Sequence, residues 1–264
     1  MPVDNAVYDR HADTWWDERS FLHTLAALTP VRFGYMRRVL LTEVRFVPTG
    51  LRALDIGCGG GFLAEEFARL GFAVTGIDPS APSLAVARTH AATQGLPITY
   101  WCAMGEALPF PDASFDVTYC CDVLEHVADI KRVIAESARV LRPGGVYLYD
   151  TINRTLRSKL IVIWLLQEWR WSSLMPPDLH DWQMFIRPAE LRALLERHGL
   201  LPQGFTGLTP RAKPVRILRA LRARKRGVLS HAEVFRRLDL GESADTSVLF
   251  MGYARKAPAG SVSN

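Results

Sequence analysis

The sequence predicts a doubly wound α/β fold, in which a mostly parallel β-sheet carries helices on both faces. Between residues 51 and 150, apolar runs suited to buried strands alternate with runs of helical period, joined by short links. Residues 54–61 (LDIGCGGG) place a glycine-rich turn between the first strand and the first helix. A second strand ends in Asp78, about 20 residues after that turn, as in nucleotide-binding βαβ units.

Composition limits the class of protein. The 264 residues suit one α/β domain with extra elements, and 48% hydrophobic residues can bury a sizeable core. The four cysteines lack the C-x-x-C spacing of zinc sites, which favours a reduced, cytoplasmic protein. No stretch resembles a signal peptide or reaches the roughly 20 apolar residues that span a bilayer. We therefore expect a cytoplasmic protein, soluble or peripheral at a membrane, with a net charge of +5.

Residues 1–50 are expected to form a helical lead-in or lid ahead of the core. Aromatic and apolar residues recur along it at helical spacing, and Pro30 and Pro48 would bracket its second helix. Trp15 and Trp16 have two interpretations. They pack this segment onto the core, or they cover a bound substrate.

Residues 51–150 are expected to be the cofactor-binding core. Its strands are predicted near 52–56, 73–77, 98–102, 115–121 and 145–150. Its helices are predicted near 61–70, 80–93 and 130–141. Residues 151–256 would complete the domain, with a helix and a strand over 188–207 and a last strand over 247–255. We expect a disordered tail over 257–264.

The glycine-rich turn indicates a nucleotide-like ligand, because it exposes backbone N–H groups at a helix N-terminus. An acid in the place of Asp78 accepts hydrogen bonds from ribose hydroxyls. The spacing Gly59-x-Gly61-x-x-Ala64 fits a nicotinamide cofactor and S-adenosylmethionine equally well. Residues further along the chain must decide between them.

Two later stretches each allow more than one role. Residues 158–175 join an apolar run to three tryptophans and basic flanks, which fits a buried helix, a substrate cap or a segment on a membrane surface. Residues 211–226 hold eight Arg or Lys around apolar residues at helical spacing, which predicts a basic amphipathic helix. Its basic face would be solvated, or would bind anionic lipid or nucleic acid.

Four further motifs follow the third strand in order. They are EALPF (106–110), FDV (115–117), LEH (124–126) and LRPGG (141–145). With the glycine turn and Asp78, this series resembles the class I S-adenosylmethionine-dependent methyltransferases, and nicotinamide enzymes have no reason to carry the later four. The resemblance implies a Rossmann-like sheet of seven mostly parallel strands and S-adenosylmethionine as cofactor.

The same resemblance implies where the cofactor binds. The turn at Gly57 would face its methionine part, Asp78 its ribose, and Met104 with its neighbours its adenine. Many relatives carry an acid where Met104 stands. In this chain, backbone contacts or packing must bind the adenine in its place. The implied cofactor-binding residues are Arg32, Asp55, Gly57, Gly59, Asp78, Met104, Gly105, Glu106 and Cys121.

The flanks are similar to the ubiquinone-biosynthesis O-methyltransferases. The motifs are WWD (15–17), TPVRFGY (29–35), TINR (151–154), the tryptophan-rich segment and HDWxxFIxPxE (180–190). The similarity covers most of residues 8–200, and residues 211–226 depart from it. It implies that Arg32 binds the carboxylate of the cofactor. It also implies methyl transfer to a phenol of a polyprenylated catechol, a small hydrophobic aromatic substrate.

The sequence does not decide which residue removes the phenol proton. His126 and His180 are candidate bases, because histidine exchanges protons near neutral pH, and either could instead be structural. Asp122, Glu125 and His126 stand at i, i+3 and i+4, so a helical turn would gather them to hold Mg²⁺ or Zn²⁺ against a catecholate. The alternative is that LEH only starts and packs a helix.

Three other functions are compatible with the motifs. The first is C- or N-methylation of another small lipid or natural product. The second is an RNA-binding methyltransferase using residues 211–226, which is disfavoured because no RNA-binding domain or interleaved aromatic residues accompany them. The third is a cofactor-binding scaffold without activity. The sequence does not indicate an oligomeric state.

Overall fold

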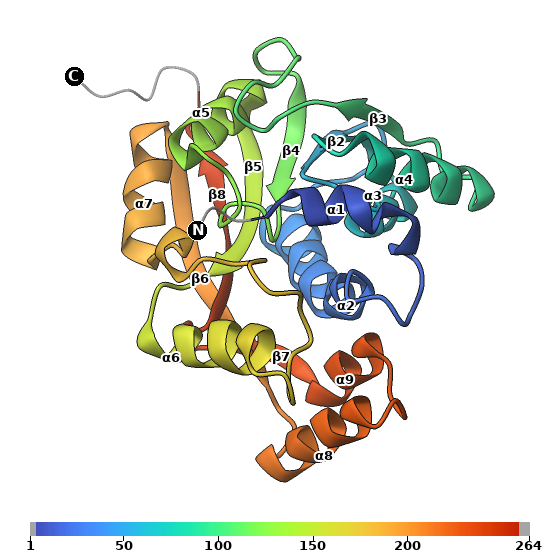
Figure 1. Cartoon of the computed structure of the whole chain (residues 1–264). Helices are drawn as coiled ribbons and strands as arrows, with labels where there is room; N and C mark the ends of the chain where they lie inside the picture. Colours follow the sequence, from blue (N-terminus) through green and yellow to red (C-terminus); the bar gives the residue numbers. More distant parts are fainter. Residues whose placement is uncertain (1–3, 259–264) are drawn as a thin grey trace.

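The computed structural model describes residues 4–258, and its centre is a sheet of eight strands. They are β1 (Arg52–Ile56), β2 (Ala73–Asp78), β3 (Thr99–Cys102), β4 (Phe115–Cys120), β5 (Leu141–Ile152), β6 (Leu200–Pro210), β7 (Leu240–Ser243) and β8 (Leu249–Lys256). Side by side they follow the order β3-β2-β1-β4-β5-β8-β6-β7 (Figure 1). Most of the predicted tail, residues 259–264, lies outside the described residues.

The predicted α/β fold is confirmed, with eight strands rather than seven. Strands β1 to β5 pair in parallel, whereas β8 runs antiparallel to both β5 and β6. The unexpected strand, β7, runs antiparallel to β6 at the edge of the sheet. Its sequence, LGES, has no apolar alternation, so only its pairing with β6 makes it a strand.

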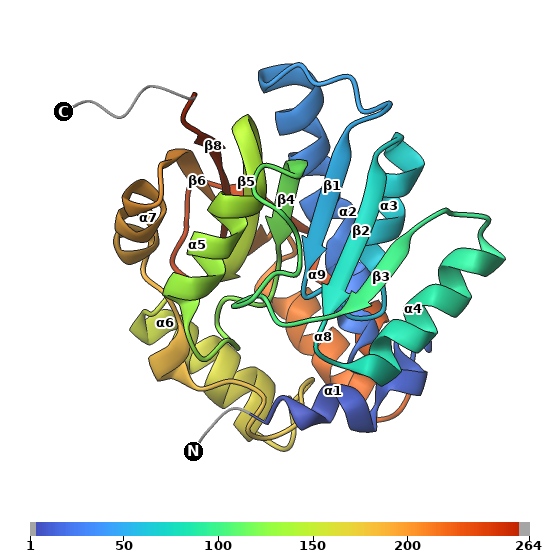
Figure 2. The ribbon, with the colours of Figure 1, turned by 90° about the horizontal axis from the view of Figure 1, so that it is seen from above.

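Helices cover both faces of the sheet (Figure 2). One group consists of α2 (His23–Arg38), α3 (Phe62–Leu70) and α4 (Ala81–Thr93), and the other of α5 (Ile130–Val140) and α7 (Pro188–Arg197). Successive side chains of β5 point to opposite faces of the sheet, so this strand contributes to the core on each face. Val146 and Leu148 pack with the first group, and Tyr147 and Tyr149 with the second. This double burial explains why the strand is apolar on both sides.

The lead-in is helical, as predicted, but Pro30 does not bound its second helix. The lead-in consists of α1 (Ala6–Arg10), the 3₁₀ turn η1 (Ala12–Thr14), α2 and the π-helical turn η2 (Val39–Glu43). Pro30 lies inside α2 and faces solvent, while Leu28 and Arg32 on either side of it are buried. Burial of this helix face outweighs the cost of an interior proline.

The tryptophan-rich segment begins as a helix that is buried on one side only, and its last residues, 169–175, lie outside the helix. It comprises α6 (Leu156–Ser158) and the π-helical η3 (Lys159–Glu168), followed by the short 3₁₀ turn η4 (Trp182–Met184). Val162 is 4% exposed, whereas Leu160 and Trp164 are each 48% exposed. No helix within residues 4–258 has the length and hydropathy needed to cross a membrane.

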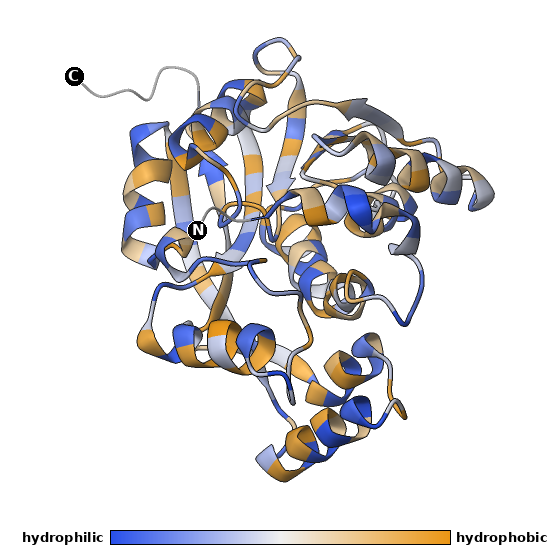
Figure 3. Ribbon diagram, in the orientation of Figure 1, coloured by the Kyte–Doolittle hydropathy of each residue, from blue (hydrophilic) through white to orange (hydrophobic). Residues whose placement is uncertain are grey.

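The predicted basic helix over 211–226 forms as α8 (Pro214–Lys225) and is followed by α9 (His231–Leu238). Figure 3 shows hydrophilic and hydrophobic residues interleaved along α8. The sequence reading missed α9, although Ser230 and Glu233 form a capping box, a recognisable helix-start signal. Both helices pack on α2 and on the end of the tryptophan-rich segment through a small apolar cluster.

Candidate active site

A cavity of about 630 Å³ lies at the carboxyl ends of β1, β2 and β4, and we call it the cofactor cavity. Its wall includes the glycine-rich turn. Gly57 has φ of +74°, and a Cβ there would lie 2.3 Å from Val123 Cγ2. At Gly59, where φ is +48°, a Cβ would lie 2.6 Å from the Trp15 ring. Any larger residue would displace these neighbours, so the cavity wall depends on glycine.

Asp78 ends β2, and its carboxylate lines the cofactor cavity. Its Oδ2 accepts the Gly59 N–H at 2.9 Å and its Oδ1 accepts the Ser80 N–H at 2.8 Å. Burial raises the pKa of Asp78 above its ordinary value, although the two hydrogen bonds act in the opposite direction. The carboxylate is thus fixed in place, with acceptor sites left for hydroxyl groups of a ligand.

The structure brings most of the predicted cofactor-binding residues together. Those that line the cofactor cavity are Gly57, Gly59, Asp78, Met104, Gly105, Glu106 and Cys121. Asp55 and Arg32 are not among its lining residues. Asp55 is buried in β1, where burial and the charge of Asp78 raise its pKa well above the ordinary value.

Arg32 lies in a buried ion-pair cluster instead. Its Nη1 and Nη2 contact both carboxylate oxygens of Asp122, and its Nε lies 2.7 Å from Asp150 Oδ2. The Asp122 N–H donates to Asp150 Oδ1 at 2.9 Å. Arg32 therefore positions the loop after β4, and any effect on the cofactor passes through Asp122, which does line the cavity.

The predicted metal set is not assembled on a helix. Asp122 has φ of +53°, and turns follow it until Asp129 caps α5, so the expected helical turn does not form. The Asp122 carboxylate is held by Arg32, and Glu125 accepts the Thr151 hydroxyl at 2.8 Å. Within residues 4–258, no group of three or more His, Cys, Asp or Glu side chains is arranged to hold a metal ion.

His126 and His180, the predicted bases, lie next to each other. Their ring centroids are 4.9 Å apart, and neither Nδ1 has a hydrogen-bond partner among the described residues. Burial lowers the pKa of His126 to about 4 and that of His180 well below its ordinary value. Burial therefore favours the neutral form of both imidazoles and makes each a weaker base than a solvent-exposed histidine. His126 lines the cofactor cavity, and His180 does not.

A second cavity of about 170 Å³, the apolar cavity, adjoins the first. The two share four lining residues: Tyr8, Leu25, Asp122 and His126. The Tyr8 ring stacks on Trp15 and meets the His126 ring edge-on, at centroid distances of 6.1 and 6.0 Å. Sequence reasoning missed Tyr8 because nothing local distinguishes it from a packing residue of a short helix.

The two lead-in tryptophans pack onto the core beside the glycine turn. Trp15 Nε1 donates to Ser83 Oγ at 2.9 Å, and Trp16 Nε1 donates to the Gly60 carbonyl at 3.1 Å. The Trp16 ring also stacks on His90, with centroids 3.4 Å apart. Trp15 lines the cofactor cavity. Both tryptophans thus pack the lead-in onto the core, and Trp15 also forms part of the cavity wall.

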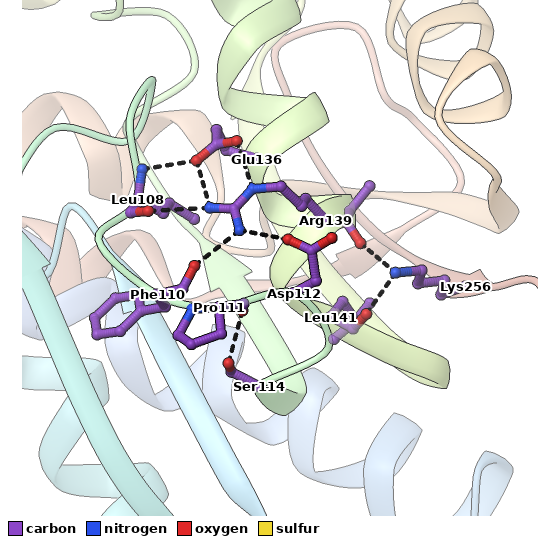
Figure 4. Close-up of polar contacts among 10 residues, drawn as sticks. Leu108, Phe110, Pro111, Asp112, Ser114, Glu136, Arg139, Leu141 and Lys256 are labelled. Carbon is purple, nitrogen blue, oxygen red and sulfur yellow. Dashed lines mark hydrogen bonds and ion pairs between the residues drawn. The ribbon is translucent and has the colours of Figure 1, made fainter.

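Arg139 of α5 anchors the loop that carries the predicted adenine-binding residues (Figure 4). It donates to the carbonyls of Leu108 and Phe110 at 3.0 and 2.8 Å, and to Glu136 and Asp112. Glu136 in turn accepts the Leu108 N–H at 2.8 Å. Sequence reasoning missed this anchor because its partners lie about 30 residues away, beyond the range of any local pattern.

The cofactor cavity fits S-adenosylmethionine. It offers a fixed carboxylate for hydroxyl groups, glycines that leave space for close approach, and the loop at Met104 as a border for a planar base. Within residues 4–258 the lining acids are Asp9, Asp78, Glu106 and Asp122, and no Lys or Arg lines the cavity. This charge balance suits a ligand with a sulfonium and an ammonium group.

Comparisons with known proteins agree with this site. Residues 54–149 match the family model of the methyltransferase domain. The chain is 41% identical to the ubiquinone biosynthesis O-methyltransferase of Caulobacter vibrioides over 78% of its own length and 84% of that protein. The enzyme of that name from Paramagnetospirillum magneticum is 37% identical, over 78% of this chain and 84% of that protein.

Solved structures show the same fold at low sequence identity. A SAM-dependent methyltransferase from Aquifex aeolicus has a TM-score of 0.52 at 15% identity, over 83% of this chain and 93% of that chain. A geranyl diphosphate methyltransferase has a TM-score of 0.56 at 18% identity, over 84% of this chain and 77% of that chain.

Proposed function

Because the chain belongs to the ubiquinone biosynthesis O-methyltransferase family, we propose that it methylates a phenolic oxygen of a catechol with an apolar tail. It is an S-adenosylmethionine-dependent methyltransferase. The observation that carries the proposal is the shared wall of the two cavities, where Tyr8, Asp122 and His126 face both. A ring placed there would meet the cofactor on one side and apolar side chains on the other.

When bound, S-adenosylmethionine supplies an electrophilic methyl group. The residues of this chain would align the acceptor oxygen with it and take up the phenol proton. His126 is the candidate for the second task because it lines both cavities and its Nδ1 has no partner among the described residues. His180 stands directly behind it, with its backbone N–H held by Gln167 at 2.9 Å, and would orient the His126 ring.

A divalent cation remains the second candidate for lowering the pKa of the phenol. To bind one, Asp122 would have to leave Arg32, with Glu125 and His126 turning toward the same point. Methyl transfer from labelled S-adenosylmethionine to a short-tailed prenyl catechol, with and without EDTA, separates the two. Product that persists in EDTA supports His126 acting without metal. Product lost in EDTA and restored by Mg²⁺ or Zn²⁺ would establish the cation.

The same assay tests the type of reaction. Product on the catechol oxygen supports O-methylation. Absence of product with cofactor binding intact would remove the catechol substrate and favour C- or N-methylation of another small molecule. Loss of product on His126→Ala, with the affinity for S-adenosylhomocysteine retained, would support His126 as the base. Loss on His180→Ala alone would transfer that role to His180.

An anionic membrane surface is the partner that best suits the outer side of the tryptophan-rich segment and α8. Leu160 and Trp164 are each 48% exposed, and Val215 on α8 is 52% exposed. No ion pair within residues 4–258 involves a Lys or Arg of α8. Exposed apolar groups beside unpaired cations match anionic lipid.

Sedimentation with vesicles tests this. We expect binding to phosphatidylglycerol vesicles, release at high salt, and weak binding to phosphatidylcholine vesicles. Replacing Arg216 and Arg219 by Glu should weaken the binding, and the same charge change at Arg187, which precedes α7, and at Arg197, which ends it, should not. Binding that ignores lipid charge would contradict the role of α8. A salt-sensitive shift of RNA would instead favour nucleic acid.

A further inference from the structure

We propose that the apolar cavity binds the tail of the acceptor next to its ring, and that Leu238 and Phe235 of α9 decide how large a tail it accepts. The inference rests on the proposed function and concerns its substrate specificity. Both residues line the apolar cavity and neither lines the cofactor cavity. The wall they form is therefore met only by a group that extends away from the methyl donor.

Most side chains that line the apolar cavity are hydrocarbon, and two of its polar side chains are already paired within the protein. The Thr24 hydroxyl donates to the Phe21 carbonyl at 2.6 Å, and Arg157 pairs with Asp245 at 2.5 Å. His126, whose Nδ1 has no partner among the described residues, lines both cavities, so the polar end of the apolar cavity adjoins the region of the methyl donor. A ligand that fits is polar at that end and hydrocarbon beyond it.

The volume sets the size of the tail. An apolar cavity of about 150 Å³ stays free of water and accepts a benzene-sized guest. At about 170 Å³, this cavity holds one branched five-carbon unit with little room to spare. The first unit of a tail would therefore be buried, and later units would lie outside the cavity. Affinity should rise steeply with the first unit and then level off.

The helix that bears this wall is fixed to its surroundings. Ala232 and Val234 are fully buried, and the Ser230 and Glu233 capping box fixes the start of α9. The His231 ring contacts the Arg19 carbonyl at 2.8 Å, which ties α9 to the lead-in. The wall that α9 contributes to the apolar cavity is therefore held in place from two sides.

The experiment measures methyl transfer to four acceptors: catechol and catechols bearing one, two or three prenyl units. For the wild type we expect kcat/KM to rise at least tenfold from catechol to the first unit and to change less than threefold beyond it. Leu238→Phe should remove most of the rise in kcat/KM that the first prenyl unit gives, and should leave kcat/KM for unsubstituted catechol unchanged. Leu238→Ala should enlarge the cavity, so that kcat/KM continues to rise up to the acceptor with two prenyl units and levels off only after it. Leu201→Phe, on exposed β6, is the matched control.

Calorimetric titration of the same acceptors, with S-adenosylhomocysteine bound, gives a readout that does not need turnover. If no catechol is methylated, the proposed function fails, while a prenyl-dependent affinity that Leu238→Phe abolishes would still support the tail site. If catechol itself loses activity in parallel with the prenylated acceptors, the inference is overturned. Melting temperatures close to the wild type show that the variants fold.

Discussion

Arg32 of α2 holds Asp122 of the loop after β4 through both of its terminal nitrogens, at 2.5 and 2.6 Å. Arg32 is only 3% exposed. Burial alone would lower its pKa, and the charges of Asp122 and Asp150 more than offset this, so the guanidinium is charged. The lead-in and the loop that carries His126 are therefore joined through one buried cation.

Removing that cation should destabilise the fold. We expect Arg32→Met to lower the free energy of unfolding by about 3–5 kcal/mol, because Asp122 and Asp150 would be left buried without a counter-charge. Urea unfolding measures the change. Arg37→Met, on the exposed side of the same helix, is the control and should change stability by no more than about 0.5 kcal/mol. Equal losses in the two variants would refute the buried cluster.

Asp78→Ala should weaken binding of S-adenosylmethionine by about 10- to 100-fold, because a charged acceptor contributes about 1.5–3 kcal/mol per hydrogen bond. Calorimetry measures the dissociation constant. Asp78→Asn keeps one side-chain oxygen for the Ser80 N–H, so it separates loss of charge from collapse of the turn. Exposed Asp13→Ala is the control. An unchanged affinity would take the ribose role away from Asp78.

We propose that the lead-in acts as a lid on the cofactor cavity, and that the contacts of Trp16 with the core hold this lid closed. Trp16→Ala removes the stack on His90 and the hydrogen bond to Gly60, together worth about 1–2 kcal/mol. Dissociation of labelled S-adenosylmethionine, followed after dilution into unlabelled cofactor, should become about tenfold faster. Trp171→Ala, outside both cavities, should leave the rate unchanged. If both variants release the cofactor at the wild-type rate, the lid is ruled out.

Acid should loosen the loop that Arg139 anchors. The hydrogen bond from Arg139, helped by the Leu108 N–H, holds the pKa of Glu136 below its ordinary value. A carboxyl group with a lowered pKa in the folded state stabilises the fold above its unfolded pKa, and this contribution is lost as the pH falls through the folded value. Glu136→Gln should therefore cost about 1 kcal/mol at pH 7 and progressively less below pH of about 4.

Urea unfolding at several pH values checks this, with exposed Glu196→Gln as the control. A difference between wild type and Glu136→Gln that stays constant as the pH falls to about 3 would contradict the ion pair, because protonation of the wild-type carboxylate should bring its stability closer to that of the variant.

Local signals predicted the part of the site that belongs to single elements. Gly57, Gly59 and Asp78 lie next to one another because each ends or follows a strand of the parallel sheet, and that rule can be applied to a sequence. The existence of β5 was also predicted, from the apolar run near residues 145–150. Pairings between distant segments carry no such signal, which is why Arg139 with Leu108 could not be predicted.

The errors have specific physical causes. Glu125 and His126 were expected on a helix because their spacing fits one, but Asp122 takes a left-handed conformation and α5 starts only at Asp129. Pro30 and Pro48 were expected to bracket the second helix of the lead-in, but Pro30 lies inside α2, where burial of its neighbours keeps the helix intact. The apolar cavity could not be foreseen, because its wall joins α2, η3 and α9.

The place of β8 in the sheet affects how the protein is made. Within residues 4–258 it is the last strand in chain order, and it pairs with both β5 and β6. Until residues 249–256 leave the ribosome, β5 presents an open edge of unpaired backbone groups, and the antiparallel half of the sheet cannot close onto the parallel half. Such an edge can pair with other chains. The nascent protein thus passes through a stage that is prone to aggregation and suited to capture by chaperones.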